Sequence, residues 1–211
     1  MARQHLIEES GVVAVVRLDD LTQAVKVTEA LVAGGVTNVE FTFTNPAAGD
    51  AISAARSAVG DRAHIGAGTV LDPETARIAI LAGAEYVVTP TTKVATIEMC
   101  RRYSIPTIIG GFTATEMLTA WEAGATFIKV HPAGLGGPRY FKDILGPLPQ
   151  LKLIPSGGVT LENAADFIRA GAVAVALGSN LVDGKTVANA DWSEITRRAT
   201  ELIEAVKAAR T

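Results

Sequence analysis

Short, largely apolar runs of three to five residues recur along the chain, with longer segments of helical pattern between them. Runs without a strict apolar–polar alternation are typical of strands that are buried on both faces of a sheet. Eight such runs occur, at residues 12–16, 38–42, 64–67, 86–89, 107–109, 127–130, 151–154 and 173–177. We therefore predict eight strands joined by helices, which is an α/β arrangement.

The segments between these runs each carry one apolar stripe at the spacing of a helix. Residues 21–31 illustrate the pattern, with Leu21, Ala24, Val25, Thr28 and Leu31 on one face. Ala-Gly pairs at 33–34, 82–83, 123–124 and 170–171 lie between such a segment and the next strand, where glycine suits the end of a helix. The pairs recur at intervals of roughly 40–50 residues, about two strand–helix units, which indicates a repeated plan.

Eight strand–helix units in 211 residues favour a (β/α)8 TIM barrel that forms a single domain over residues 1–211. A last amphipathic segment would close the ring as a terminal helix, with an apolar stripe of Ile195, Ala199, Leu202, Ile203 and Val206. The alternative is an open doubly wound sheet, which usually has a glycine-rich dinucleotide-binding turn after its first strand. Residues 16–20 are Val-Arg-Leu-Asp-Asp and contain no such turn.

Composition narrows the classes of function. The chain has 19 Lys and Arg against 22 Asp and Glu, a net charge of -3, so it offers no basic field for a nucleic acid. No apolar run approaches the ~20 residues of a membrane span, and residues 1–10 lack the apolar core of a secretion signal. A single cysteine, Cys100, fits a reducing compartment, so we expect a cytoplasmic protein. The three histidines form no metal-binding pair, and we expect neither a metal nor a cofactor.

Lys129 stands within the apolar run Phe127-Ile128-Lys129-Val130. The functional residues of a barrel come from the C-terminal ends of its strands, where this lysine falls. Burial of an ammonium group removes its hydration, which lowers its pKa and exposes a nucleophilic amine suited to Schiff-base chemistry. The alternative is a structural lysine whose stem packs on the barrel while its charged end reaches water.

Glu40 lies inside the second predicted strand. Burial would raise the pKa of its carboxyl group toward the range in which it can exchange protons with a substrate. It is therefore a candidate proton shuttle beside an imine. The alternative is a structural ion pair between Glu40 and Arg17, which follows the neighbouring first strand.

Glycine-rich loops follow the seventh and eighth predicted strands. The first contains Ser156, Gly157 and Gly158, and the second contains Gly178 and Ser179. Loops at these two places in a barrel often bind phosphate, because backbone N–H groups converge there. We therefore expect a phosphate ester as the substrate, with two ordinary glycine turns as the alternative.

In their order along nearly the whole chain, these motifs resemble the class I family of 2-keto-3-deoxy-6-phosphogluconate (KDPG) aldolase and 4-hydroxy-2-oxoglutarate aldolase. The matching motifs are Gly35-Val36 with Glu40-Phe41-Thr42, Gly66-Ala67-Gly68-Thr69-Val70, Lys129 with Pro132, Pro155-Ser156-Gly157-Gly158-Val159, and Gly178-Ser179 with Leu181-Val182. The fold that the resemblance implies is the same barrel.

The resemblance implies that Lys129 forms an imine with C2 of the substrate and that Glu40 is the general acid and base. It also implies positions in the substrate pocket for Arg17 and Thr69, on the pocket wall for Pro90, and around the phosphate for Ser156, Gly157, Gly158, Gly178 and Ser179. The implied reaction is the reversible cleavage of KDPG to pyruvate and glyceraldehyde 3-phosphate. Family members commonly form homotrimers, so the expected partners are small 2-keto acids, aldehydes and further copies of the chain.

Two positions depart from the family pattern. Many members carry an arginine at the position of Thr44, so the substrate carboxylate would be held by Arg17 with the hydroxyls of Thr69 and Thr44. Phenylalanine is usual at the position of His131, whose ring would face the pocket on the same side of the strand as Lys129. It would either bond a substrate hydroxyl or simply replace one aromatic ring with another. An unphosphorylated substrate such as 4-hydroxy-2-oxoglutarate, and a non-catalytic barrel that binds a phosphorylated ligand, remain alternatives.

Overall fold

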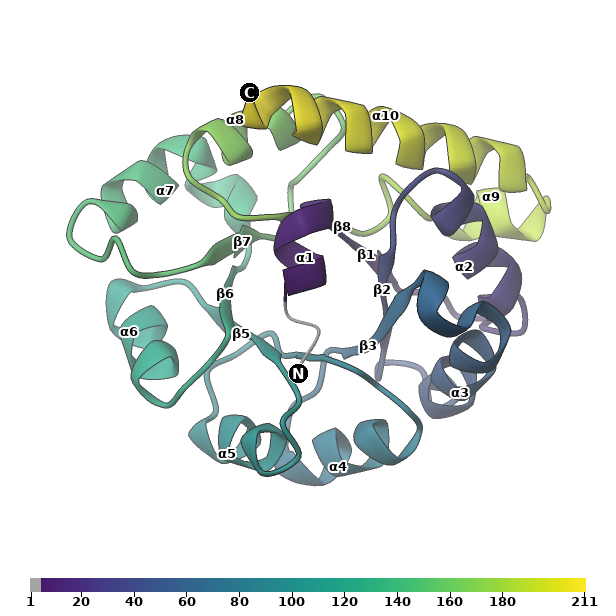
Figure 1. The fold of residues 1–211 in the computed structure, drawn as a ribbon, viewed down its shortest axis with the longest axis horizontal. Coiled ribbons are helices and arrows are strands. Elements are labelled where there is room, and N and C mark those ends of the chain that lie inside the picture. Colours follow the sequence, from purple (N-terminus) through teal and green to yellow (C-terminus); the bar gives the residue numbers. More distant parts are fainter. Residues whose placement is uncertain (1–4) are drawn as a thin grey trace.

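The computed structural model describes residues 5–211 and has a ring of strands inside a ring of helices (Figure 1). Eight strands within these residues confirm the predicted barrel. They are β1 Val12–Val16, β2 Asn38–Thr42, β3 His64–Gly68, β4 Val87–Val88, β5 Thr107–Gly111, β6 Phe127–Val130, β7 Leu153–Pro155 and β8 Val175–Leu177.

The strands are parallel and hydrogen-bond in the order β7-β6-β5-β4-β3-β2-β1-β8. The two ends of this sheet meet through the isolated parallel bridge between Ser156 and Ala176. The backbone N–H of Val173 also donates to the carbonyl of Leu153 at 3.0 Å. The sheet therefore comes close to full closure, and the open doubly wound alternative is wrong.

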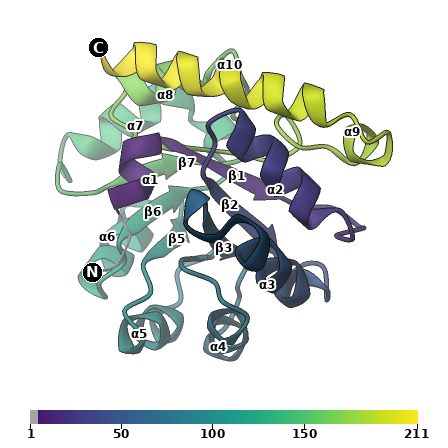
Figure 2. The same cartoon turned by 45° about the vertical axis from the view of Figure 1, so that its right-hand side comes forward.

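Helices α2 to α10 surround the barrel, and α1 His5–Ser10 lies across one end of it. The surrounding helices are α2 Ala24–Ala33, α3 Ala48–Val59, α4 Pro73–Leu81, α5 Val94–Arg102, α6 Ala114–Glu122, α7 Gly137–Leu145, α8 Ala164–Arg169, α9 Gly184–Ala188 and α10 Trp192–Arg210, with short 3-10 turns at Gly60–Arg62 and Ala133–Leu135. The predicted terminal helix is α10, which packs on both α8 and α2 (Figure 2). No helix in residues 5–211 has the length and apolarity needed to cross a membrane.

The side chains of each strand alternate between two buried layers, as expected for a strand covered on both faces. In β1, Val12, Ala14 and Val16 face the helices, whereas Val13 and Val15 face the barrel interior. The interior layer includes Ile7 of α1, a helix that the sequence pattern did not predict and that lies across the ring in Figure 1. Residues 1–4, part of the polar N-terminal segment, lie outside the described residues.

Several predicted boundaries differ from those observed. The predicted strand 86–89 keeps only Val87 and Val88, because the hydroxyl of Thr89 accepts the N–H of Gly110 at 3.1 Å in place of a backbone ladder bond. The predicted strands 151–154 and 173–177 begin later, at Leu153 and Val175. Helix α8 begins at Ala164, after a turn at residues 161–163. Asn163 Oδ1 accepts the N–H of Thr160 at 2.8 Å, which closes this turn before the helix starts.

Candidate active site

Lys129 and Glu40 meet inside the barrel from opposite sides of the sheet. Lys129 is on β6 and Glu40 on β2, and Nζ of the lysine lies 4.0 Å from Oε1 of the carboxylate. Their side chains are 5% and 1% exposed. The structure thus contradicts both structural alternatives for these residues: the lysine does not reach bulk water, and its amine, rather than Arg17, is the cation paired with Glu40.

Burial dominates the electrostatics of this pair. Loss of hydration raises the pKa of Glu40, although the charges of Lys129 and Arg17 act against that rise. Loss of hydration also lowers the pKa of Lys129, with Glu40 opposing and Arg17 reinforcing the effect. Both shifts bring the pKa values of the two groups closer together, which eases proton exchange between a nucleophilic amine and an acid–base carboxyl group.

Glycines on the adjacent strand make room for the carboxylate. Glu40 pairs with Gly66 in the register of β2 and β3, and a Cβ atom on Gly68 would lie 2.7 Å from Oε1 of Glu40. A side chain at position 68 would therefore displace the carboxylate. The Gly66-Ala67-Gly68 motif therefore leaves the space that the Glu40 carboxylate occupies.

A cavity of about 230 Å³ opens above Lys129. It is lined by Val15, Arg17, Lys129, His131, Ser156, Gly157, Gly158, Val159, Ala176, Gly178, Ser179 and Asn180. The lysine and both predicted phosphate loops therefore share one cavity. Gly157 and Gly158 have φ angles of +77° and +83°, a left-handed conformation that favours glycine and directs this backbone around the cavity.

Arg17 lines the cavity, and Thr69, which does not line it, is bonded to Arg17. Nη2 of Arg17 donates to Oγ1 of Thr69 at 3.3 Å. Thr69 has a φ of +56°, which is uncommon and strained for a β-branched residue. The strain brings the hydroxyl to the guanidinium group, in a conformation that the sequence did not predict.

His131 lies on the same side as Lys129, as predicted. Its Nδ1 lies 3.2 Å from the carbonyl oxygen of Ser156, which orients the ring. Its pKa is lowered, first by loss of hydration and then by the charge of Lys129. A Cβ atom on Gly157 would lie 2.8 Å from Nδ1, so the ring packs directly against the phosphate-loop backbone. A neutral imidazole is the form favoured here.

Thr44 and Pro90 lie next to the centre without lining this cavity. The hydroxyl of Thr44 is exposed and lies 2.9 Å from that of Thr42. Pro90 packs against Gly110, where a Cβ atom would meet the backbone carbonyl of the proline. Pro90 therefore shapes the barrel end beside Lys129 through its backbone.

Asn180 is a polar residue of the cavity that the sequence reasoning missed. Its Nδ2 donates to the carbonyl of Val159 at 2.9 Å, which ties the loop after β8 to the loop after β7. Its place immediately after Gly178-Ser179 was the available signal. Among residues 5–211, no group of three or more His, Cys, Asp or Glu side chains is placed to hold a metal ion.

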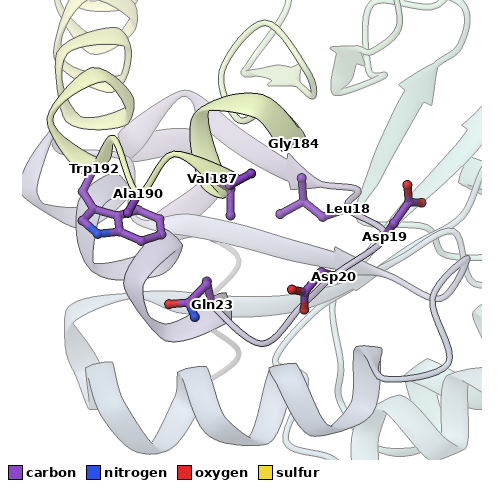
Figure 3. Close-up of a pocket in the computed structure, with 9 residues that line it drawn as sticks. Leu18, Asp19, Asp20, Gln23, Gly184, Val187, Ala190 and Trp192 are labelled. Atoms are coloured by element: carbon purple, nitrogen blue, oxygen red, sulfur yellow. The ribbon is translucent and has the colours of Figure 1, made fainter.

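A second cavity, of about 580 Å³, lies at the edge of the molecule between the β1–α2 loop and the α9–α10 segment (Figure 3). Leu18, Val187 and Trp192 give it an apolar wall, and Asp19 and Asp20 contribute two carboxylates. Its lining contains no cationic side chain. An anionic substrate would be repelled there, so the smaller cavity above Lys129 is the candidate active site.

The family model of KDPG and KHG aldolase matches residues 4–198. The chain belongs to this family. The 2-dehydro-3-deoxy-phosphogluconate aldolase of Treponema pallidum is 33% identical over 201 residues, which cover 95% of each chain. The 2-dehydro-3-deoxy-6-phosphogalactonate aldolase of Escherichia coli is 39% identical over 153 residues, 72% of this chain and 75% of that protein.

Solved structures of this family share the barrel. The KDPG aldolase of Legionella pneumophila, which holds pyruvate captured at low pH as a covalent carbinolamine intermediate, has a TM-score of 0.88 and 28% identity. The match covers 95% of this chain and 98% of that one. As a member of the KDPG and KHG aldolase family, the protein is an aldolase and therefore a lyase.

Proposed function

We propose that this aldolase cleaves a phosphorylated 2-keto-3-deoxy sugar acid, KDPG, to pyruvate and glyceraldehyde 3-phosphate through an imine on Lys129. The observation that carries the proposal is the buried amine of Lys129, 4.0 Å from Glu40, at the floor of a cavity bordered by two glycine-rich loops. The names of the Treponema pallidum and Legionella pneumophila relatives point to the same substrate.

Lys129 is the nucleophile of the proposed mechanism. Its unprotonated Nζ adds to the C2 carbonyl carbon, and the carbonyl oxygen takes up a proton to give a carbinolamine. Protonation of that hydroxyl and loss of water then give a protonated imine. Burial of Lys129 supports the first step, because it lowers the pKa of the amine and so raises the fraction that is free of its proton.

Glu40 moves the protons of the proposed mechanism. Its carboxylate accepts the proton of the C4 hydroxyl while the C3–C4 bond breaks, and the electron pair of that bond passes into the imine to form an enamine. The aldehyde leaves, the carboxyl group returns its proton to C3, and water hydrolyses the resulting imine to release pyruvate and free Lys129. The raised pKa of Glu40 supports both directions of transfer.

The two glycine-rich loops are proposed to bind the phosphate. Ser156 contributes a hydroxyl and the backbone at Gly157, Gly158, Gly178 and Ser179 contributes N–H groups along the same cavity. Arg17 and Thr69, with Thr44 nearby, are proposed to hold the carboxylate of the 2-keto acid, and Pro90 to limit the pocket. The whole barrel, residues 1–211, acts as a single domain in this proposal.

Borohydride reduction with pyruvate tests the proposed mechanism, because it turns an imine into a permanent adduct. A pyruvyl adduct mapped to Lys129, together with pyruvate release from KDPG, is the expected result. Absence of the adduct in active enzyme would contradict the imine. Tight binding of KDPG without pyruvate release would instead favour a non-catalytic binding barrel.

An unphosphorylated substrate such as 4-hydroxy-2-oxoglutarate is the second candidate. His131 favours it, because a neutral imidazole beside Ser156 occupies part of the cavity that a phosphate would fill and can bond a hydroxyl or a carboxylate. Inorganic phosphate separates the two candidates. Competitive inhibition by phosphate, and a higher kcat/KM for KDPG, are expected if the loops bind phosphate. The C4 epimer of KDPG, 2-dehydro-3-deoxy-6-phosphogalactonate, should be tested in the same assay, since the Escherichia coli relative is named an aldolase of that compound.

We also infer that the protein assembles as a cytoplasmic homotrimer. Family resemblance suggests the trimer, and exposed apolar side chains on and beside α4 give it a surface: Leu71, Ile78, Leu81 and Val94. The single cysteine, Cys100, is free and buried, which suits a reducing compartment. Burial raises the pKa of its thiol to about 12. Light scattering of the wild type should give three times the monomer mass, and Leu81→Asp should reduce it. A monomeric wild type would contradict the inference.

A further inference from the structure

Tyr86 is a buried phenol next to the catalytic pair that the mechanism above does not use. Its side chain is 0% exposed, and its hydroxyl has no hydrogen-bond partner among the described residues. Both carboxylate oxygens of Glu40 also lack hydrogen-bond partners there. An unsatisfied buried polar group is costly, and the barrel interior holds both of these.

The barrel register brings these two groups together. Glu40 pairs with Gly66, and Ala67 pairs with Val87, which sets Tyr86 beside Gly66. Gly66 has no side chain, and the hydroxyl-bearing half of the Tyr86 ring occupies the space that one would need. A Cβ atom on Gly66 would lie 2.5 Å from Cε2 of Tyr86. The ring therefore crosses β3 toward β2, with the hydroxyl at its leading end, toward the strand that carries Glu40.

Of the two carboxylates whose charge acts on Tyr86, those of Glu40 and Glu85, only that of Glu40 lacks a hydrogen-bond partner among the described residues. The ring of His64 lies 4.8 Å from that of Tyr86. Glu85, the preceding residue, is ion-paired with Arg56 at 3.3 Å and accepts the N–H of Ile65, so its carboxylate is already engaged. Burial raises the pKa of Tyr86, and the charges of Glu40 and Glu85 add to that rise, which keeps the phenol protonated as a donor.

We propose that Tyr86 is a positioning residue for Glu40, and that its hydroxyl donates a hydrogen bond to the carboxylate while Glu40 is ionised during turnover. This inference rests on the proposed imine mechanism. The Nζ–Oε1 distance of 4.0 Å is too long for a hydrogen bond, so the lysine does not fix the carboxylate. Conversion of the amine to an imine removes N–H donors from Lys129, and the phenol then supplies the donor that holds Glu40 in place.

The donor also sets the pH at which Glu40 works. A hydrogen bond to the ionised form favours ionisation, so removal of the hydroxyl should raise the pKa of Glu40 further. Lys129 from β6, Arg17 from the end of β1, Tyr86 from the start of β4 and His64 from β3 are the other titratable or charged groups that face this space. Tyr86→Phe changes only one of them and keeps the ring that fills the space over Gly66.

Exchange of the pyruvate methyl protons for deuterium, followed by NMR in D2O, tests the inference, because this exchange needs the imine and Glu40 but neither aldehyde nor phosphate. Tyr86→Phe is expected to slow exchange about tenfold, with the acidic limb of the pH profile moved to higher pH. Its melting temperature should equal or exceed that of the wild type, since the lost hydroxyl has no partner in the resting state. Tyr103→Phe, at an exposed tyrosine immediately after α5, is the matched control.

A double-mutant cycle with Glu40→Gln distinguishes positioning from a general effect on structure. If Tyr86 acts through Glu40, Tyr86→Phe should cause no further loss of exchange in the Glu40→Gln background. Wild-type exchange rate and pH profile in Tyr86→Phe would overturn the inference while leaving the imine intact, and so would an equal loss in both backgrounds. Absence of exchange in the wild type would overturn the proposed function itself, and with it the inference.

Discussion

Nζ of Lys129 lies 4.0 Å from Oε1 of Glu40, on strands that are four positions apart in the barrel order. Within residues 5–211, neither side chain has another ion-pair partner within 4.0 Å. The two groups therefore share the cost of burial, and the protonation state of each depends on that of the other.

Removal of the Lys129 amine should abolish turnover. Lys129→Met keeps an unbranched apolar stem in the barrel and is expected to lose at least ~10⁴-fold in kcat/KM, because no other lysine amine lines the cavity to form the imine. Borohydride should no longer trap pyruvate on the protein. Lys152→Met is the matched control, since that lysine is 39% exposed and pairs with Glu8 outside the cavity. Full activity in Lys129→Met would remove the mechanism.

Glu40→Gln should separate imine formation from carbon–carbon cleavage. The amide has nearly the same shape but cannot accept the C4 hydroxyl proton, so cleavage is expected to slow by about 10²–10⁴-fold. Trapping of pyruvate on Lys129 should persist, and single-turnover kinetics with mass detection would measure both steps. A wild-type cleavage rate would assign the proton transfer to another group.

Burial of Lys129 also predicts a pH dependence of stability. Its pKa in the folded protein lies below the ordinary value of 10.5, so between these two values the unfolded chain binds more protons. The free energy of unfolding should therefore rise with pH through this window, whereas the raised pKa of Glu40 has the opposite effect just above 4.5. Urea unfolding from pH about 7 to 10 should show a rise in the wild type that Lys129→Met lacks. Parallel curves for the two proteins would contradict the lowered pKa.

Gly110 should not tolerate a side chain. A Cβ atom there would meet the backbone of Pro90 and lie 2.5 Å from the N–H nitrogen of Thr91, and backbone atoms cannot rotate away. Gly110→Ala is expected to lower the melting temperature by about 5–10 °C, from an overpacking cost of roughly 1–3 kcal/mol. Gly184→Ala, where no atom lies within 4 Å of the added carbon, should leave it nearly unchanged. Equal melting temperatures for both variants would rule out the tight contact.

Asp183 should stabilise the segment after β8. Its carboxylate accepts from Arg198 at 2.7 Å and from the N–H of Thr186 at 3.0 Å, where it caps α9. The bonds to Arg198 and then to Thr186 hold the pKa of Asp183 well below its ordinary value of 3.8. We expect Asp183→Asn to cost about 1–2 kcal/mol near neutral pH, because both partners are only partly exposed.

The stability difference between the wild type and Asp183→Asn should become smaller in acid. The contribution of Asp183 is complete above the ordinary value of 3.8 and is lost as pH falls through the lowered pKa. The unfolding curves of the wild type and Asp183→Asn should therefore converge in strong acid. Asp166→Asn is the control, because its ion pair with Arg169 is 59% exposed on both sides and should contribute little. A constant difference down to strong acid would contradict the assignment.

Much of the fold follows from local pattern alone. Strands buried on both faces must be apolar along their length, so runs such as 12–16 and 127–130 were visible without any tertiary information, and each ended as observed. Strand β4, Val87–Val88, is shorter than predicted because the hydroxyl of Thr89 takes the place of a backbone acceptor in the ladder. The pattern of apolar residues does not predict such a side-chain bond. Helix α1 carries a single buried residue, Ile7, which is too little for an apolar stripe.

The sequence and the tertiary structure also contribute different parts of the candidate active site. The sequence by itself determined that an amine, a carboxyl group and two glycine-rich loops stand at the ends of barrel strands, because strand order places all such ends at one mouth. Only the tertiary structure decided the 4.0 Å approach of Lys129 to Glu40, the strained backbone of Thr69 and the course of Tyr86 over Gly66. These depend on the register between strands far apart in the chain, and on the space that a glycine on one strand leaves for a side chain of the next.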